Sequence, residues 1–486
     1  MTLVVRLAEL AAAIGLRPSA GWERIDITGV TEDSRCVRRG ALFVAVPGTV
    51  CDGADFLDDA IERGAVAIAS STDREVEVPH LRVDDARAAL AALAAAFYRR
   101  PTESLFTVGV TGTNGKSTVC RWIAHLLGED RTTVVGTVAN AARGLKAVTT
   151  PSSPIVQRVA ADVRDDGREH LVLEASSIGL AQRRLDAVDF DVAVFTNLSH
   201  DHLDLHGTME AYLDAKRILF RGLKPEATAI VNADDPAGMA VVAGCVAEVM
   251  SYGLADQAEL RAVDPVYAAR ETRCTVVRHG EAATLRLPHP GPHNLSNALA
   301  AAAVALCRGG RLERIAARLE SAPTVDGRLQ FFVRPDGVRA VVDYAHTPDG
   351  LRRVLDIVRP RDRRLFVVFG CPGESDRAKR PVMGEIAGAL ADRTVVTADN
   401  PKHEDPAAIC DEIEAGLRRA GAPWDRILDR SDAIAHAVDL AVPGDVVLVA
   451  GKGHEREQIV GDAFVPHSDR DVLGRLGFVD DPGVAA

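Results

Sequence analysis

The sequence lacks the features of secreted, membrane-spanning and nucleic-acid-binding proteins. Its eight cysteines include no C-x-x-C pair, which argues against a zinc ribbon and suits reduced thiols in a cytosol. The first apolar stretch, "MTLVVRLAELAAAIGL", contains Arg6 and Glu9, so it predicts an amphipathic helix rather than a signal peptide or membrane span. A net charge of −12 argues against a general nucleic-acid surface. We therefore expect a soluble, cytoplasmic protein.

What the sequence does contain is a series of short apolar runs that end in polar residues. One set includes "HLVLEASS" and "DVAVFTNLSHDH", and a second includes "LFVVFGCPGE" and "DVVLVAGKGHE". Such runs, alternating with helical stretches, predict parallel sheets with ligands beyond the carboxyl ends of the strands. The 486 residues suffice for about three domains. We predict an α/β protein with a small N-terminal α/β domain (1–103), a central ATP-binding, parallel-sheet domain (104–328) and a C-terminal doubly wound, Rossmann-like domain (329–486).

The stretch "VGVTGTNGKST" at 108–118 is similar to a phosphate-binding loop with unusual spacing. The common pattern G-x4-G-K-S/T requires glycine where Val110 stands. An apolar run precedes the loop and helical apolar spacing follows it, so the order is strand, loop, helix. Backbone N–H groups at the helix start would face an anion, Lys116 supplies a cation and the Ser117 hydroxyl can ligate Mg²⁺. The loop predicts an ATP site; the alternative is a glycine-containing turn with an exposed lysine.

A dense polar cluster, "TNLSHDHLDLHGTMEAYLDAKRILF", occupies residues 196–220. Its three histidines raise the possibility of zinc, but their spacing matches no compact zinc motif, and an ATP site needs Mg²⁺, which prefers oxygen ligands. A hydrogen-bonded structural role is the alternative for His200 and His206.

Taken in order, these motifs resemble those of a known family. They are "TGTNGKS", "LEASS", "FTNLSHDHLDLHGTMEAYLDAK", "VNADD", "HNLSNALAA", "GRLQ", "DYAHTPD", "KRPVMGEIA", "DNPK" and "GKGHE". The order resembles the Mur ligases of peptidoglycan precursor synthesis, and most of all the MurE type, the UDP-N-acetylmuramoyl-tripeptide synthetases, whose loop has the same unusual spacing. The resemblance implies a three-domain Mur ligase architecture. It also implies ATP-dependent addition of the third amino acid to UDP-MurNAc-L-Ala-D-Glu through an acyl phosphate, with release of ADP and phosphate.

The resemblance assigns catalytic and metal-binding roles, with ATP and Mg²⁺ as cofactors. Lys116 would neutralise the ATP phosphates, Ser117 and Glu174 would bind one Mg²⁺, and His202 would bind a second. Lys216 matches a lysine that is carbamylated in the family: CO₂ adds to the neutral amine and gives a carboxylate that helps hold the metals. Without these neighbours, Lys216 would be read as a surface lysine on a helix.

The resemblance also assigns the residues that contact ATP. Asn297 and Asp343 would contact base and ribose, and Arg328 would lie near the phosphates; capping or turn formation is the alternative for Asn297. The complete ATP set is Gly112, Thr113, Asn114, Gly115, Lys116, Ser117, Thr118, Asn297, Arg328 and Asp343.

The resemblance also implies one set of residues for the UDP substrate and another for the incoming amino acid. Arg184 has a fork geometry suited to a carboxylate of the muramoyl dipeptide. The residues implied for the UDP substrate are Ser34, Arg35, Thr149, Thr150, Ser176, Gln182 and Arg184. Those implied for the incoming amino acid are Ser375, Asp399, Asn400, Lys402, Gly451 and Glu455.

The sequence departs from the family pattern mainly in the substrate regions. Ser375 stands where the family carries an arginine that grips the acceptor carboxylate, and Arg377 two residues on is a candidate replacement. Lys402 gives "DNPK" where ligases of meso-diaminopimelate have "DNPR"; lysine offers a point charge where arginine binds a carboxylate bidentately. Other departures are Ala54, Ile178 and Gln330.

Three alternatives to this function remain open. The chain could be a MurE-like ligase recruited to another pathway, joining an amino acid to a different carboxylate. It could be a non-catalytic binding protein on the same scaffold, or a P-loop kinase or GTPase, although the last leaves "DNPK" and "GKGHE" unexplained. We expect a monomer whose partners are small molecules, namely a UDP-muramoyl dipeptide, an amino acid and ATP, with neither nucleic acid nor membrane among them.

Overall fold

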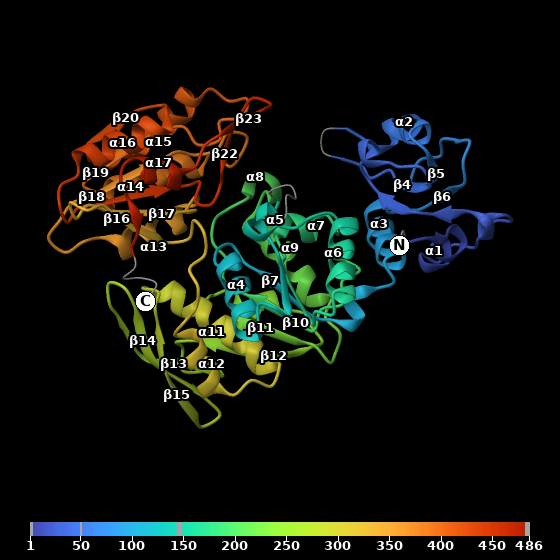
Figure 1. Ribbon diagram of the computed structural model, residues 1–486, viewed down its shortest axis with the longest axis horizontal. Coiled ribbons are helices and arrows are strands. Elements are labelled where there is room, and N and C mark those ends of the chain that lie inside the picture. Colours follow the sequence, from blue (N-terminus) through green and yellow to red (C-terminus); the bar gives the residue numbers. More distant parts are fainter. Residues whose placement is uncertain (1–2, 49–50, 143–147, 482–486) are drawn as a thin grey trace.

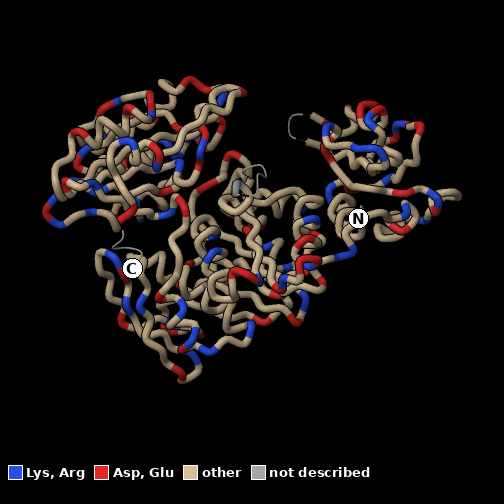
Figure 2. The backbone as a smooth tube through the Cα atoms, in the orientation of Figure 1, with Lys and Arg blue, Asp and Glu red and all other residues tan. Residues whose placement is uncertain are grey.

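The computed structural model describes residues 3–48, 51–142 and 148–481, which form three bodies (Figure 1). The central body, coloured from cyan to yellow, lies between an N-terminal body in blue and a C-terminal body in orange and red. Acidic and basic residues are interspersed over all three (Figure 2). In the described part of the chain, no helix is long and apolar enough to cross a membrane.

The N-terminal body is a small parallel sheet covered by helices. The strands, in sheet order, are β3 (Gly29–Thr31), β4 (Ala41–Val44), β5 (Ala65–Ser70) and β6 (His80–Arg82). The helices are α1 (Leu7–Ala13), α2 (Leu57–Glu62) and α3 (Ala86–Phe97), and a short antiparallel pair comprises β1 (Val5–Arg6) and β2 (Asp26–Ile27). The amphipathic helix expected near the N-terminus is therefore confirmed as α1, which buries Leu7 and Leu10.

The central body contains a nine-stranded sheet. The strands run parallel from β8 (Thr132–Val135) through β9 (His170–Glu174), β7 (Phe106–Thr111), β10 (Val192–Phe195), β11 (Thr228–Asn232) and β12 (Glu248–Gly253) to β13 (Leu260–Tyr267). The strands β14 (Thr272–Arg278) and β15 (Glu281–Leu287) extend the sheet antiparallel. The parallel sheet agrees with the sequence prediction, whereas the antiparallel ribbon was not predicted.

Helices cover both faces of this sheet. Along β10, Val192 and Val194 face one core while Ala193 and Phe195 face the other, because successive side chains of a strand point to opposite faces. Trp122 of α4 packs into the first core. The helices are α4 (Lys116–Leu127), α5 (Thr137–Ala142), α6 (Ser153–Asp165), α7 (Ser177–Ala181), α8 (Leu203–His206), α9 (Met209–Arg221), α10 (Gly238–Val241), α11 (Pro292–Cys307) and α12 (Leu312–Leu319).

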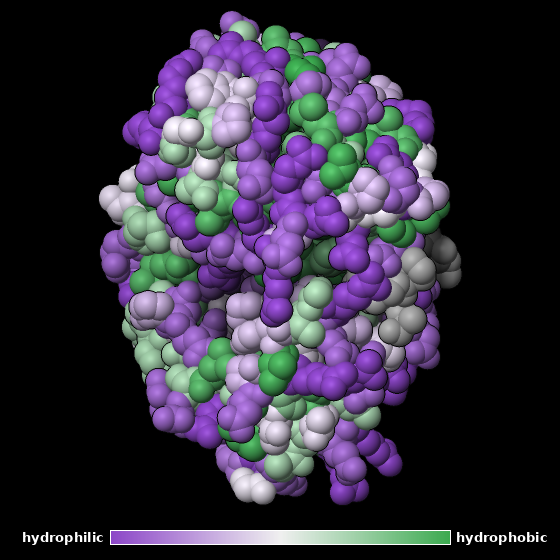
Figure 3. Space-filling model, turned by 90° about the vertical axis from the view of Figure 1, so that its left-hand side faces the viewer, coloured by the Kyte–Doolittle hydropathy of each residue, from purple (hydrophilic) through white to green (hydrophobic). Residues whose placement is uncertain are grey.

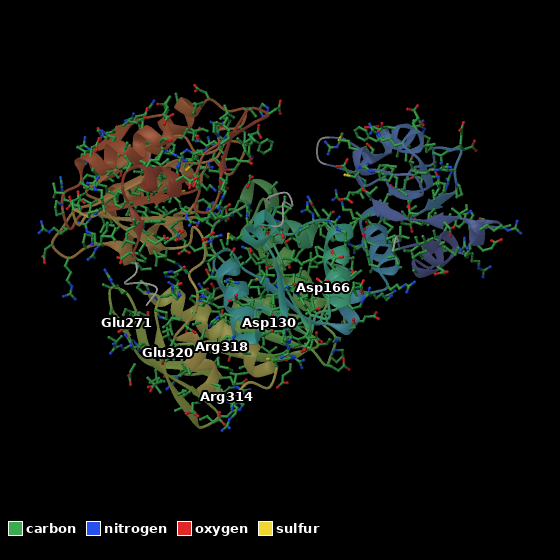
Figure 4. All side chains as sticks on the ribbon, in the orientation of Figure 1. Asp130, Asp166, Glu271, Arg314, Arg318 and Glu320 are labelled. Carbon is green, nitrogen blue, oxygen red and sulfur yellow. The ribbon has the colours of Figure 1, made fainter. Side chains whose placement is uncertain are left out.

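Charged residues mark the outer side of the central body. Arg314 and Arg318 lie on α12 and Glu320 follows it (Figure 4). The Arg318 guanidinium donates to the carbonyl of His125 at 2.7 Å, which ties α12 to α4.

The C-terminal body is doubly wound, as predicted. Its sheet has the order β20 (Trp424–Arg426), β19 (Arg393–Val396), β18 (Leu365–Phe369), β21 (Val446–Ala450), β17 (Arg339–Asp343), β16 (Gln330–Val333) and β24 (Val479–Asp480), with β16 and β24 antiparallel. One face is covered by α13 (Pro348–Val358), α14 (Lys379–Leu390) and α15 (Pro406–Ala420), and the other by α16 (Arg430–Leu440) and α17 (Asp469–Arg475). A hairpin, β22 (Glu457–Val460) and β23 (Ala463–Pro466), projects beside this sheet (Figure 1).

Candidate active site

A cavity of about 590 Å³ lies where the central and C-terminal bodies meet. This volume is in the range of about 300–1,000 Å³ typical of small-molecule sites. Viewed from the side, the surface is mainly hydrophilic, with hydrophobic residues in small groups (Figure 3). The cavity is lined by six residues of the expected ATP set: Asn114, Gly115, Thr118, Asn297, Arg328 and Asp343.

The loop between β7 and α4 forms one wall of this cavity. Gly112 (φ 147°) and Gly115 (φ 89°) have left-handed backbone conformations that favour glycine. A Cβ atom on Gly112 would clash with Thr196, and one on Gly115 would clash with the Asn297 side chain. The Lys116 ammonium donates to the carbonyls of Gly112 (2.8 Å) and Thr113 (2.9 Å). The strand, loop and helix follow one another as the sequence predicted.

Ser117 and Glu174 meet beneath the loop. The Ser117 hydroxyl donates to the Glu174 carboxylate at 2.9 Å, and the Thr137 N–H donates to the same oxygen at 3.1 Å. Burial raises the pKa of Glu174, and the charge of Lys116 opposes that rise. Burial lowers the pKa of Lys116, and the charge of Glu174 opposes that fall. A hydroxyl and a carboxylate side by side are the oxygen ligands that Mg²⁺ prefers.

Lys216 of α9 is buried, with only 1% of its surface exposed. Its amine lies 4.1 Å from the centre of the Tyr212 ring. Burial holds the pKa of Lys216 well below its usual value, and Lys116 adds to the effect, so the neutral amine is favoured. The alternative reading of Lys216 as a surface lysine is therefore wrong.

Asp201 is a buried carboxylate that sequence reasoning missed. It lies 3.4 Å from His202, 3.9 Å from His346 and 3.9 Å from Lys379. The last two belong to the C-terminal body, so Asp201 connects the two bodies. Burial lowers the pKa of His202, which favours the neutral imidazole that can bind a metal. The only sequence signal was the position of Asp201 between two histidines in "SHDHLD".

The other two histidines of this segment make structural hydrogen bonds. His200 contacts the Asp376 carboxylate at 2.8 Å, and His206 contacts the Ser177 hydroxyl at 3.0 Å and stacks on Tyr212. Among the described residues, no three His, Cys, Asp or Glu side chains are arranged to hold a metal ion. A metal at this site would therefore also need hydroxyl, carbamate or phosphate oxygens.

Arg328 and Asp343 form the wall of the cavity on the C-terminal side. The Arg328 guanidinium lies over the Tyr344 ring at 4.3 Å and reaches the Ser117 hydroxyl at 3.4 Å. Asp343 accepts the N–H groups of Leu329 (2.6 Å) and Ala345 (2.8 Å), which fixes the loop that carries Arg328. The lining residues that were not predicted from the sequence include Asn197, His293 and Tyr344.

Five of the residues expected to bind the UDP substrate cluster beside Glu174. The Thr150 hydroxyl donates to the Glu174 carbonyl at 2.7 Å and contacts Ser176 at 2.9 Å. Arg184 donates to the Thr150 carbonyl and to Gln182, both at 2.6 Å. The fifth residue, Thr149, contacts the Thr137 hydroxyl at 2.9 Å.

Ser34 and Arg35 lie apart from this cluster, in the N-terminal body. Arg35 pairs with its neighbour Asp33 at 2.8 Å. In the described ranges, no hydrogen bond joins Ser34 or Arg35 to the Thr150 cluster, although an ion pair between Arg183 and Asp85 (2.8 Å) links the two bodies.

The residues expected to bind the amino acid lie at the carboxyl ends of β18, β19 and β21. Asn400 donates to Glu455 at 2.9 Å, and Lys452 donates to both, at 2.9 and 2.6 Å. A Cβ atom on Gly451 (φ 110°) would lie 2.7 Å from the Asp399 carboxylate, so this close approach requires glycine. Burial raises the pKa of Glu455, and Lys452 opposes that rise.

Arg377, the candidate replacement for the missing arginine, already has a partner in this chain. It pairs with Glu412, and its side chain is 66% exposed. Ser375 donates to the carbonyl of Pro372 at 3.3 Å within its own loop.

Comparison with known proteins gives matches over most of the chain. Residues 26–98 match the model described as Mur ligase family, catalytic domain; residues 110–305 match the Mur ligase middle domain; and residues 327–453 match the Mur ligase, glutamate ligase domain.

Several similar proteins carry the name UDP-N-acetylmuramoyl-L-alanyl-D-glutamate–2,6-diaminopimelate ligase. The protein from Geobacillus kaustophilus is 41% identical over 464 residues, which cover 92% of this chain and 94% of that protein. The protein from Gloeobacter violaceus is 41% identical over 476 residues (96% and 97%). A solved structure with the same name is 31% identical, with a TM-score of 0.67 over 97% of this chain and 98% of that one. The MurF ligase of Thermotoga maritima in complex with ADP, 23% identical over 88% of this chain and 94% of that one, shares the fold (TM-score 0.63).

Proposed function

This chain belongs to the Mur ligase family and is an ATP-dependent amino-acid ligase, and we propose that it adds the third amino acid to UDP-N-acetylmuramoyl-L-alanyl-D-glutamate. The observation that carries this proposal is the pairing of Ser117 with Glu174 beneath a glycine-rich loop. The buried amine of Lys216 lies within electrostatic reach of Lys116 in the same loop.

The cavity residues fit ATP and Mg²⁺. Arg328 Nε is buried without a hydrogen-bond partner in the described part of the chain, as is Nδ1 of His293, and both residues line the cavity. The α4 N-terminus, Lys116 and Arg328 would hold the phosphates, and Asn297 and Asp343 the nucleoside. Ser117, Glu174, His202 and a carbamylated Lys216 would hold two Mg²⁺ ions. Bound Mg²⁺ neutralises charge that develops on the transferring phosphoryl group.

The chain's own residues position the two reaction steps. In the first, an oxygen of the substrate's D-glutamate carboxylate attacks the γ-phosphorus of ATP, and ADP leaves. Arg184 and the Thr150 cluster would hold this carboxylate, while Lys116 stabilises charge on the phosphates. In the second, the amine of the amino acid attacks the acyl carbon and phosphate leaves. Joining the bodies through Asp201, Lys379 and His346 would place the amine against the acyl phosphate and exclude water.

The three bodies would then divide the substrates among them. We assign the uridine part to the N-terminal body, through Ser34 and Arg35, and ATP to the central body. The amino acid would bind the C-terminal body through Asp399, Asn400 and Glu455. On this account the chain acts as a cytoplasmic monomer on small molecules.

The test is phosphate release by the purified protein with ATP, Mg²⁺, UDP-MurNAc-L-Ala-D-Glu and single amino acids, with product masses recorded. We expect phosphate release that requires both the nucleotide substrate and an amino acid, together with a tripeptide product. Lys116→Ala should abolish release while the protein remains folded. Amino-acid-dependent release that occurs only with a different carboxylate would instead support a ligase recruited to another pathway.

A further inference from the structure

Residues 199–202, between β10 and α8, link the phosphate-binding loop to a proposed metal ligand. The N–H of Ser199 donates to the Thr113 hydroxyl of that loop at 3.0 Å, and this hydroxyl donates to the Ser199 carbonyl at 3.3 Å. At the other end, His202 has a left-handed backbone conformation (φ 54°), which is uncommon for residues other than glycine. Such a conformation persists only where surrounding contacts hold it. The position of the His202 imidazole therefore depends on the contacts of the two residues before it.

These two residues, His200 and Asp201, both contact the C-terminal body. Nε2 of His200 lies 2.8 Å from an oxygen of the Asp376 carboxylate. Asp201 lies 3.9 Å from the Lys379 amine, and both of these side chains are almost fully buried. The other oxygen of Asp376 accepts the N–H of Ala378 at 2.9 Å, which fixes the carboxylate just before α14. One short stretch of the C-terminal body, residues 376–379, therefore meets both His200 and Asp201.

Asp201 carries the negative charge of this contact. It lies 3.4 Å from His202 in its own body and 3.9 Å from His346 in the C-terminal body. His346 is fixed in turn, since its Nδ1 contacts the carbonyl of Tyr344 at 2.8 Å. A buried carboxylate is stable only when it is paired, so Asp201 favours the arrangement in which Lys379 and His346 face it. Docking of the C-terminal body thus fixes Asp201 and, through the chain, the adjacent His202.

On the premise of the function proposed above, we propose that His200 and Asp201 are positioning residues. By contacting residues 376–379 they hold His202 in place, so that metal binding at His202 and docking of the C-terminal body stabilise each other. The factor by which docking raises the metal affinity equals the factor by which the metal favours docking. The site that holds the phosphates is then complete only when the body that carries the amino acid is in place.

The test measures Mn²⁺ binding by electron paramagnetic resonance, with a β,γ-methylene analogue of ATP present. Mn²⁺ is the probe because it shares the preference of Mg²⁺ for oxygen ligands. His202→Asn identifies the ion bound at His202, because the wild type should bind that ion and this variant should not. Two changes in the other body, Asp376→Ser and Lys379→Met, should each raise the Kd of the same ion by about tenfold. Unchanged Kd values in both variants would overturn the inference.

The choice of variants separates the coupling from damage to the fold. Asp376→Ser keeps an acceptor for the Ala378 N–H but is too short to reach His200. Because His200→Ala and Asp376→Ser remove the same contact, the double variant should bind Mn²⁺ no more weakly than either single variant. Losses that simply add would contradict a shared contact.

A matched control breaks a different ion pair between the same two bodies. Arg270 of the central body lies 3.1 Å from Asp481 of the C-terminal body, and 43% of the Arg270 side chain is exposed. Arg270→Gln should leave the Kd of the ion at His202 unchanged, because an exposed pair contributes little to docking. A loss as large as that in Asp376→Ser would show that the effect does not pass through His200 and Asp201.

Steady-state kinetics give a second measure of positioning. In Asp376→Ser and Lys379→Met, kcat should fall while KM for UDP-MurNAc-L-Ala-D-Glu stays unchanged, because the residues proposed for that substrate lie in the other two bodies. Tripeptide formation by the wild type, with unchanged Mn²⁺ binding in the variants, would overturn the inference and leave the proposed function intact. The expected Mn²⁺ losses without a tripeptide from any amino acid would overturn the proposed function and leave the coupling.

Discussion

Lys216 and Tyr212 lie one turn apart on α9, and the lysine amine rests 4.1 Å from the centre of the tyrosine ring. The ring and the surrounding core exclude water from the amine, and burial keeps its pKa well below the usual value. A neutral amine is the form that reacts with CO₂, so this packing explains how one lysine could become an anionic ligand inside the protein.

The first prediction concerns carbamylation of Lys216. With ¹³C-labelled bicarbonate, the wild-type protein should give a carbamate carbon signal by NMR, and Lys216→Ala should not. Ligase activity of the variant should fall by roughly 10²–10³-fold, the scale found when one electrostatic stabiliser of a transition state is removed. Lys224→Met, which removes a half-buried lysine paired with Asp189 (2.9 Å) and Asp191 (3.3 Å), is the control and should keep both signal and activity.

The second prediction concerns the stability cost of the unmodified amine. Because the folded-state pKa of Lys216 lies below its unfolded value near 10.5, the folded protein is destabilised at every pH below that value. The cost is largest below the folded pKa and disappears as pH rises toward 10.5. In CO₂-free buffer, Lys216→Met should therefore increase the free energy of unfolding by roughly 1–3 kcal/mol at pH 7, and by less at pH 10. An equal gain at both pH values would show that the amine is not responsible.

The third prediction concerns acid sensitivity at His293, which lines the cavity. Burial lowers the pKa of His293 to about 4 from 6.5, and Arg353 adds to the effect. As pH falls below 6.5, His293 is protonated in the unfolded chain before it is protonated in the folded protein. The contribution of the neutral His293 to the free energy of unfolding is therefore complete above pH 6.5 and is lost as pH falls toward 4. The Tm of His293→Gln should depend less on pH over this interval than that of the wild type. His279→Gln, at an exposed position, should retain the wild-type slope.

The fourth prediction concerns the fully buried ion pair between Arg430 and Asp469, at 2.7 Å. Arg430 also donates to the Ala450 carbonyl at the end of β21, so the pair supports the loop that carries Gly451 and Glu455. Arg430→Met should lower the free energy of unfolding by about 3–5 kcal/mol because it leaves the buried Asp469 carboxylate with His467 as its remaining side-chain partner among the described residues. The double variant Arg430→Met with Asp469→Leu should recover much of this loss in denaturant unfolding; if it is no more stable than the single variant, the unpaired charge is not the cause.

The sequence predicted the local features of the site and missed those that depend on distant contacts. The loop around Lys116 was predictable because strand, glycine turn and helix follow one another within a few residues. Asp201 was missed because its partners, His346 and Lys379, lie more than a hundred residues away in another body. The pairing of Arg377 was missed for the same reason, because its partner Glu412 lies on α15, 35 residues further along the chain.

The assignment of individual residues to substrates stays a prediction. For Ser34, Arg35 and the Thr150 cluster, residue identity and local contacts are known, but their common role depends on a ligand that bridges two bodies. Binding of UDP-MurNAc-L-Ala-D-Glu to Arg184→Lys by calorimetry, compared with the wild type, would measure the contribution of the guanidinium fork to that role.

The most direct test of the account follows one oxygen atom through the reaction. UDP-MurNAc-L-Ala-D-Glu labelled with ¹⁸O in the D-glutamate carboxylate that forms the amide is incubated with the protein, ATP, Mg²⁺ and the preferred amino acid, and the released phosphate is analysed by mass spectrometry. An acyl phosphate requires that each phosphate carries one ¹⁸O from the labelled carboxylate. Phosphate without label, released together with tripeptide, would contradict the mechanism assigned to this site.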